Sequence, residues 1–208
     1  MRPEVLCRYY RTFTYQPVDR VPDIEFGYWP QTIRRWLREG MKLDLTPEEQ
    51  QQMFCPKVDQ YLRHEERHEA GLSLRWGMHP PFEEKIIERR EKSVIMVDGT
   101  GCLAERYQAD VDESSIPHFL KFPVQTPEDW QRLKAERYRL DDPWRVIPPA
   151  EIENVRRQAA AGCMVTVCTP GPYGALRGWL GFENLSLAFY EFPEMVQDMV
   201  SHLSALAV

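Results

Sequence analysis

Hydrophobic and polar residues alternate over residues 23–29, a pattern typical of a short β-strand. Pro30 follows at once and suits the first position of a helix, because that position needs no backbone N–H. Apolar residues then recur at helical spacing, namely at Ile33, Trp36, Leu37 and Met41. We therefore predict a strand that turns directly into a helix, which is half of a βα unit.

The segment from residue 46 to about residue 91 is rich in charged residues. Thr46 and Glu49 have the spacing of a capping box, in which the hydroxyl and the carboxylate each accept a hydrogen bond from a backbone N–H at the start of a helix. We predict a charged, helical region here, broken at Gly77 and at Pro80 and Pro81.

A β-hairpin is predicted next. Residues 93–97 and 102–107 are suited to strands, and Asp98-Gly99-Thr100-Gly101 lies between them. An Asp-Gly pair followed by a second glycine supplies the positive φ angles that a tight turn needs. The same glycines precede no helix and lack the lysine of a phosphate-binding loop, so we interpret them as a turn.

Two helices and a strand follow. Residues 126–129 repeat the capping pattern and open one helix, and residues 149–161 form another that stops at Gly162. Residues 163–168 are almost continuously apolar, as in a parallel strand that is covered on both faces.

A last helix begins at Pro193. Its apolar residues form one stripe, made of Met195, Val196, Met199, Val200, Leu203 and Leu206. The helix reaches Val208 without a cap, and only two strands suit a barrel, too few for closure. We therefore expect residues 1–208 to be one partial α/β domain, truncated at its C-terminal end. Unpaired strand edges and the apolar stripe predict self-association, with a homodimer as one form.

Composition narrows the class of protein. Twenty-six basic residues are interleaved with 32 acidic ones, and the formal net charge is −6, so no nucleic-acid surface is expected. No apolar run approaches the roughly 20 residues of a membrane span, and no secretory segment opens the chain. The five cysteines are scattered, which argues against a disulfide framework. We expect a cytoplasmic protein.

Residues 64–68 match the zinc-binding pattern H-E-x-x-H, in which two histidines on one helical face hold a metal. Charged residues surround His64 and His68 on nearly every side, whereas a metalloprotease helix is buried beside its metal. We therefore favour a solvated helix here and predict no zinc at these histidines.

The better candidates for ligand contact lie where the two predicted barrel strands end. Active sites of α/β barrels are built from such loops. A carboxylate, a guanidinium and aromatic walls suit a flat, anionic or conjugated ligand. The predicted substrate-binding residues are Glu25, Tyr28, Trp29, Tyr173, Arg177 and Trp179. The alternative is that the aromatic residues pack in the core and that Glu25 and Arg177 are surface charges.

Several segments together resemble the uroporphyrinogen-decarboxylase superfamily, which includes heme-pathway decarboxylases and methylcobalamin:coenzyme M methyltransferases. The entrance sequence D-R-V-P and the helix start T-P-E-D-W are weakly specific alone, but their order and spacing match across most of the chain. The matching segments are residues 17–22, 25–30, 114–120, 122–124, 126–130, 171–173 and 178–184.

The resemblance implies a TIM (β/α)8 barrel of the uroporphyrinogen-decarboxylase type, present here as an incomplete N-terminal portion with an inserted β-hairpin. It also implies a methyltransferase-type or decarboxylase-type enzyme related to corrinoids or tetrapyrroles. A small-molecule substrate is expected, with a corrinoid protein as a partner.

Departures from the family pattern bear on the reaction. Heme-pathway decarboxylases carry an arginine-bearing segment that binds the substrate carboxylates, whereas the matching stretch here has no arginine before Arg34 and contains Glu25. Trp179 stands near the family's substrate-facing tyrosine. In the methyltransferases, the zinc ligands belong to a C-terminal half, so we expect no cofactor within this chain. A uroporphyrinogen decarboxylase proper and a non-catalytic fragment or binding module remain the alternatives.

Overall fold

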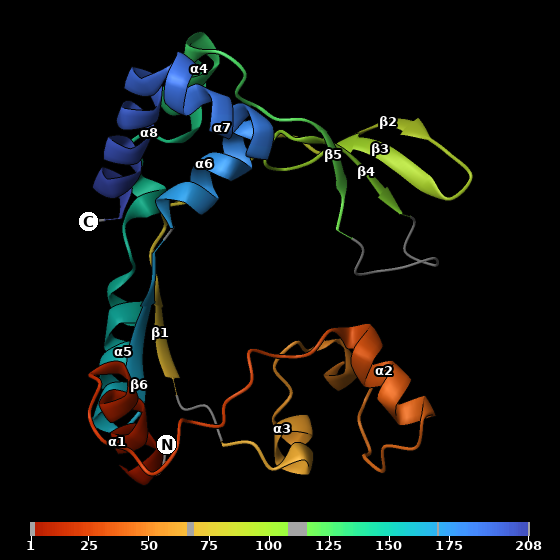
Figure 1. Cartoon of the computed structure of the whole chain (residues 1–208), viewed down its shortest axis with the longest axis vertical. Helices are drawn as coiled ribbons and strands as arrows, with labels where there is room; N and C mark the ends of the chain where they lie inside the picture. Colours follow the sequence, from red (N-terminus) through yellow and green to blue (C-terminus); the bar gives the residue numbers. More distant parts are fainter. Residues whose placement is uncertain (1–2, 66–68, 108–115, 170, 208) are drawn as a thin grey trace. The chain divides into compact units, whose positions relative to one another are not determined.

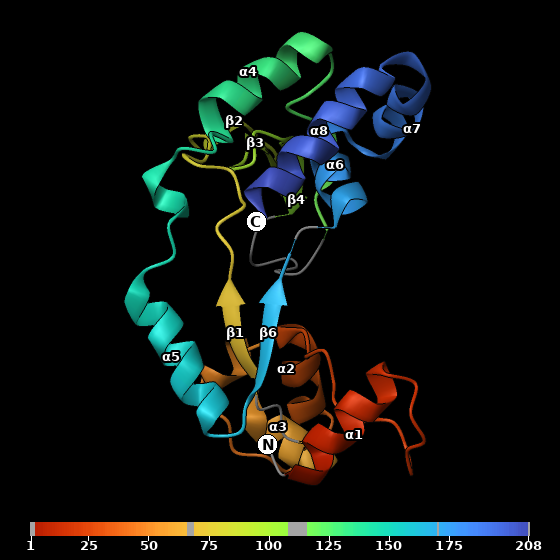
Figure 2. The same ribbon diagram turned by 90° about the vertical axis from the view of Figure 1, so that its left-hand side faces the viewer.

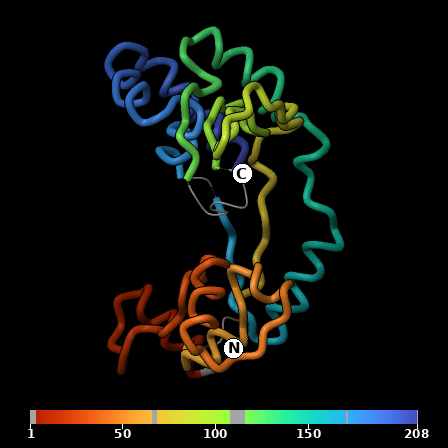
Figure 3. Tube along the Cα trace, turned by 90° about the vertical axis from the view of Figure 1, so that its right-hand side faces the viewer, coloured from red at the N-terminus to blue at the C-terminus, as the bar shows by residue number. Residues whose placement is uncertain are grey.

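The chain groups into two compact units, each built from two separate segments. A computed structural model describes residues 3–65, 69–107, 116–169 and 171–207 (Figure 1). The first unit comprises Met1–Leu72 and Ala150–Thr166, and the second comprises Ser73–Pro149 and Val167–Val208. Figure 3 follows the chain as it leaves the first unit, returns to it and leaves it again.

Helices supply most of the first unit. They are α1 (Pro3–Phe13), α2 (Pro30–Arg38), the 3-10 turn η1 (Glu49–Gln51), α3 (Pro56–Leu62) and α5 (Pro149–Ala160). The predicted helix after Pro30 and the predicted helix before Gly162 are thereby confirmed. A small core lies around α2 and α3, made of Tyr28, Ile33, Leu45, Cys55 and Val58.

Two strands, β1 (Glu69–Ser73) and β6 (Met164–Cys168), pair with each other (Figure 2). They run in the same direction, as their arrows in Figure 2 show. The apolar strand predicted over residues 163–168 is confirmed. Its predicted burial on both faces is wrong, because Val165 and Val167 are about half exposed.

The strand predicted over residues 23–29 is wrong. The segment is extended, yet it belongs to no sheet. The N–H of Tyr28 donates instead to the carbonyl of Met53 at 2.8 Å, and Gly27 adopts φ +126°, a conformation foreign to a strand. The alternation of apolar and polar residues over residues 23–29 therefore belongs to a loop, and the backbone of this loop is hydrogen-bonded to the loop that contains Met53.

The charged helical region predicted over residues 46–91 is also wrong. Thr46 and Glu49 do exchange the two hydrogen bonds of a capping box, at 2.9 and 3.3 Å. Only the 3-10 turn η1 follows, and α3 ends at Leu62. The turn ends because Gln52 is already extended, with φ −81° and ψ 120°.

The second unit contains a four-stranded antiparallel sheet with the order β2-β3-β4-β5. Its strands are β2 (Lys85–Arg89), β3 (Ser93–Val97), β4 (Leu103–Tyr107) and β5 (His118–Lys121). The predicted hairpin is confirmed in β3 and β4, which pair from Ser93 opposite Tyr107 to Val97 opposite Leu103. Asp98 closes their turn by accepting from the N–H and the hydroxyl of Thr100.

Helices of the second unit gather on a large apolar core (Figure 1). They are α4 (Pro127–Arg137), the 3-10 turn η2 (Pro143–Arg145), α6 (Pro172–Leu180), α7 (Phe182–Glu191) and α8 (Pro193–Leu206). The predicted capping box at Thr126 and Asp129 is present at the start of α4. The predicted stripe of α8 is largely buried, at Met195, Val196, Met199 and Leu203.

The TIM barrel expected from the family resemblance is wrong for this chain. Barrel strands are parallel and each needs parallel neighbours on both edges. Of the six strands in the described residues, four form consecutive antiparallel pairs and only β1 and β6 pair separately. The residues that the structure describes form a mixed α/β fold without a barrel. Ser114 and Ser115, part of one family-like segment, lie outside the described residues.

Candidate functional site

The loop over residues 25–29 is held in place by two backbone features. Tyr28 donates its N–H to Met53, and Gly27 fits so closely against the same residue that a Cβ atom there would lie 2.8 Å from both the Met53 Cγ atom and its carbonyl oxygen. Only glycine accepts this combination of contact and positive φ without strain. The loop is therefore fixed against the segment that precedes α3.

Tyr28 anchors the loop through its side chain. The ring is buried and meets Trp36 edge to face at 5.5 Å, and the hydroxyl donates to Asp59 Oδ1 at 2.9 Å. Burial and then this hydrogen bond raise the Tyr28 pKa well above its ordinary value. Tyr28 is thus a neutral donor that is already bound to Asp59, and its main role is to position its neighbours.

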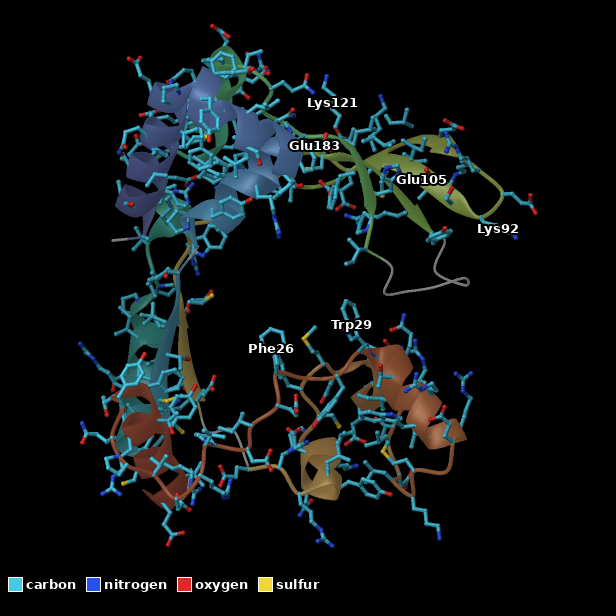
Figure 4. The ribbon with its side chains drawn as sticks, in the orientation of Figure 1. Phe26, Trp29, Lys92, Glu105, Lys121 and Glu183 are labelled. Atoms are coloured by element: carbon cyan, nitrogen blue, oxygen red, sulfur yellow. The ribbon has the colours of Figure 1, made fainter. Side chains whose placement is uncertain are left out.

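Those neighbours form an exposed apolar cluster, which we call the aromatic surface: Phe26, Trp29, Met53 and Phe54. Phe26 is 79% exposed and Trp29 is 53% exposed, while Phe26 lies edge to face with Phe54 at 6.5 Å. Figure 4 shows the Phe26 and Trp29 side chains projecting from the same side of the loop. Glu25 is exposed next to them. Apolar clusters of this kind commonly mark a binding surface.

The three predicted residues of the second unit lie on α6 but differ in exposure. Tyr173 and Arg177 are exposed and four residues apart, so they share one face of the helix. Trp179 is 5% exposed, stacks on Trp130 at 5.0 Å and donates its indole N–H to the Tyr138 hydroxyl at 2.8 Å. Trp179 therefore packs in the core, as in the alternative interpretation of the aromatic residues.

Burial also affects the partner of Trp179. Burial raises the pKa of the Tyr138 hydroxyl to about 12, while the hydrogen bond from Trp179 lowers that pKa. The Tyr138 hydroxyl is therefore neutral over the physiological range. The hydrogen-bonded pair of Trp179 and Tyr138 therefore carries no charge.

The six predicted ligand-binding residues are divided between the units. Glu25, Tyr28 and Trp29 belong to the first unit, whereas Tyr173, Arg177 and Trp179 belong to the second. A single pocket shared by both groups stays a prediction. Of the six, Trp29 belongs to the aromatic surface, and the exposed Glu25 directly precedes Phe26 of that surface.

The described residues of the H-E-x-x-H segment, His64 and Glu65, do not lie on a helix. Helix α3 ends at Leu62, and Arg63 caps it in the left-handed conformation. His64 Nδ1 lies 3.1 Å from Asp23 Oδ1, and Glu65 pairs with Arg8 at 2.6 Å and with Arg20. The solvated helix that we favoured is therefore wrong, because His64 and Glu65 tie the chain after α3 to the N-terminal segments. His68 lies outside the described residues.

The second unit contains a cavity that we did not predict from the sequence. It measures about 470 Å³ and lies between the four-stranded sheet and α4. Apolar and charged side chains both line it; the lining includes Phe82, Ile87, Val97, Leu103, Lys121, Phe122, Arg132, Leu133 and Glu136. The strand alternation and the helical spacing of residues 129, 132, 133 and 136 were both visible in the sequence. Neither signal shows that the two surfaces face each other.

Two further findings concern metals and membranes. Among residues 3–65, 69–107, 116–169 and 171–207, no three His, Cys, Asp or Glu side chains cluster as metal ligands. Within those same ranges, every helix is too short or too polar to cross a bilayer.

Comparison with family models, curated proteins and solved structures gives no match to this chain. The family resemblance therefore rests on the segments quoted from the sequence.

Proposed function

We propose that this chain belongs to a uroporphyrinogen-decarboxylase-like protein whose aromatic surface binds the flat face of a corrinoid or related tetrapyrrole. The family-like segments support the choice of ligand class, and the geometry of the loop over residues 25–29 supports the place of binding. Methyl transfer with a corrinoid protein as partner is favoured over porphyrinogen decarboxylation.

One observation carries the proposal: Phe26 and Trp29 are exposed on a loop that is anchored through the backbone and the side chain of Tyr28. Leaving large aromatic side chains in water costs free energy that burial would recover, about 25 cal/mol per Å². Gly27 and the bond between Tyr28 and Asp59 prevent the loop from folding these rings inward. A preorganised aromatic surface binds a conjugated ring system with little loss of conformational entropy.

The charge of Glu25 supports the choice of ligand. This exposed carboxylate stands beside the aromatic surface and would repel a substrate that carries many carboxylates. A corrinoid without that negative charge meets no such repulsion. The same position in the decarboxylases is adjacent to an arginine-bearing segment, according to the resemblance.

Equilibrium dialysis of the full chain against cobalamin, followed by visible absorbance, tests the proposal. We expect saturable binding, and a loss of affinity of about tenfold in Trp29→Ala and in Phe26→Ala. Tyr190→Ala is the matched control, because Tyr190 is 87% exposed but lies in the second unit. Dialysis against uroporphyrin adds a charge test, in which Glu25→Gln strengthens binding of that polycarboxylate and leaves cobalamin binding unchanged.

Absence of saturable cobalamin binding would reject the proposal. So would binding that Trp29→Ala and Tyr190→Ala weaken equally. Tighter binding of uroporphyrin than of cobalamin by the unaltered chain would favour the decarboxylase alternative.

The cavity in the second unit favours a second candidate, a binding module for a small apolar molecule. Its volume of about 470 Å³ falls in the range of ligand pockets. Leu103→Trp, which fills the cavity, separates the candidates: it should abolish binding of an apolar dye there and leave cobalamin binding unchanged.

A further inference from the structure

Among the described residues, strand β2 is an outer strand of the antiparallel sheet and has β3 on one edge only (Figure 1). All five of its residues are exposed, including Ile86 and Ile87 at 42% and 54%. An outer strand presents unpaired N–H and C=O groups that another strand can pair with. Whether it does so depends on the side chains that such pairing would bring together.

In and around β2, charged residues at equal distances along the chain before Ile86 and after Ile87 carry opposite charges. Residues 83–90 read Glu-Glu-Lys-Ile-Ile-Glu-Arg-Arg. When this segment is placed antiparallel to a copy of itself, with the symmetry axis between Ile86 and Ile87, each charge meets its opposite. Lys85 faces Glu88, Glu84 faces Arg89, and Glu83 faces Arg90.

The bulge in β2 makes this register compatible with strand geometry. Directly opposed side chains must lie on the same face of a sheet, and residues three apart in a regular strand do not. In β2, however, Lys85 lies opposite Val97 of β3 and Glu88 lies opposite Ile95, because a bulge occurs between Ile86 and Glu88. Because Val97 and Ile95 are two residues apart, Lys85 and Glu88 lie on the same face.

The same register places the second pair of charges together. Arg89 pairs with Val94, on the opposite face from Ile95, and Glu84 directly precedes Lys85. Glu84 and Arg89 therefore share the other face. Centring the pairing on Ile87 instead would set Lys85 against Arg89, which are both basic and lie on opposite faces of the strand, so this register is disfavoured by charge and by geometry.

The charges concerned are available for such pairing. Glu84, Lys85 and Arg89 form no ion pair with another described residue. Glu88 pairs with Arg90 at 2.8 Å, and Arg90 also pairs with Glu105 at 3.0 Å. Glu88 and Arg90 are both about half exposed, so exchange of Glu88 for another partner costs little.

We propose that β2 is a homodimer interface, in which two copies of this chain pair their β2 edges antiparallel to form one continuous sheet. Lys85 and Glu84 of one copy contact Glu88 and Arg89 of the other, and the two-fold axis passes between the isoleucines. This surface is independent of the aromatic surface proposed for ligand binding.

Sedimentation equilibrium of the full chain tests the dimer. We expect a monomer–dimer equilibrium that weakens as ionic strength rises. Lys85→Glu and Glu88→Lys each place like charges opposite one another twice per dimer, and each should raise the dimer Kd about tenfold. The double variant Lys85→Glu/Glu88→Lys restores opposite charges and should return the Kd to within about threefold of the original value.

A control comes from the other outer strand of the same sheet. Lys121 lies in β5 and is labelled in Figure 4, and Lys121→Glu should leave the Kd unchanged. Circular dichroism checks that each variant keeps its fold, as expected for exposed positions. A monomer at every concentration, a Kd insensitive to Lys85→Glu, or a double variant no better than the single ones would each overturn the proposal.

Discussion

The hydroxyl of Tyr28 donates a hydrogen bond to Asp59 across the first unit, at 2.9 Å. This bond joins the loop that carries the aromatic surface to helix α3. We predict that Tyr28→Phe lowers the free energy of unfolding by about 1 kcal/mol, the usual net value of one hydrogen bond. Urea denaturation measures the change. Tyr61→Phe is the control, since Tyr61 is 45% exposed and has no hydrogen bond within the described residues; an equal loss in both would contradict the assignment.

Gly27 should tolerate alanine less well than Gly40 does. Both residues have positive φ, but an added Cβ at Gly27 meets Met53 at 2.8 Å, whereas the space around Gly40 is open. Gly40→Ala therefore reports backbone strain alone, of order 1 kcal/mol, and Gly27→Ala adds the clash. We expect Gly27→Ala to be the more destabilising by about 1–2 kcal/mol in thermal or urea unfolding. Equal destabilisation by Gly27→Ala and Gly40→Ala would show that the loop moves away from Met53 at no cost in free energy.

Substitution should lower the free energy of unfolding at Trp179 and leave it nearly unchanged at Tyr173, although both residues were predicted ligand contacts. Trp179→Phe loses the hydrogen bond to Tyr138 and part of the stacking on Trp130, so the free energy of unfolding should fall by about 2–3 kcal/mol. Tyr173→Phe changes an exposed ring and should fall within about 0.5 kcal/mol of the original chain. A stable Trp179→Phe variant would contradict the core placement.

Asp198 should contribute to the acid sensitivity of the second unit. Burial opposes its charged form, but Lys134 at 2.8 Å and the indole N–H of Trp130 at 2.6 Å outweigh burial and leave its pKa below the ordinary value. A carboxylate with a depressed folded pKa stabilises the fold above its unfolded pKa, and this contribution is lost as the pH falls through the folded pKa. Stability should therefore decline below about pH 4.

Asp198→Asn should remove that part of the decline and lower stability at neutral pH. Urea denaturation between pH 2 and pH 7 measures both effects, with those pH values set by the usual range of carboxylate pKa values, about 3 to 5. Glu194→Gln is the control on the same helix, because Glu194 forms no ion pair within the part of the chain that the structure describes. An unchanged acid profile in Asp198→Asn would contradict the role of the cluster.

Elements with strong local signals were predictable from the sequence. Pro30 and the Thr126 capping box determine where α2 and α4 begin, and Asp98 with its glycines determines the turn between β3 and β4. These signals act within a few residues, so no knowledge of the surrounding fold is needed.

Several elements that depend on distant partners were not predicted. Residues 23–29 have the alternation of a strand, but Met53 rather than a neighbouring strand binds their backbone. Strand β1 lies in a segment read as helical, and its partner β6 is far along the chain. The predicted residues Glu25 and Trp29 are exposed as a ligand contact requires, whereas the cavity beside α4 depends on tertiary packing alone.

The division of each unit into two chain segments has a consequence for synthesis on the ribosome. The antiparallel sheet can assemble hairpin by hairpin as its residues emerge, because every strand pairs with the next one along the chain. Strand β1 emerges early but must wait for β6, so the first unit remains incomplete until residue 166 has left the exit tunnel. During this interval the exposed edge of β1 is open to incorrect partners, and chaperone binding to nascent chains should therefore concentrate on the first unit.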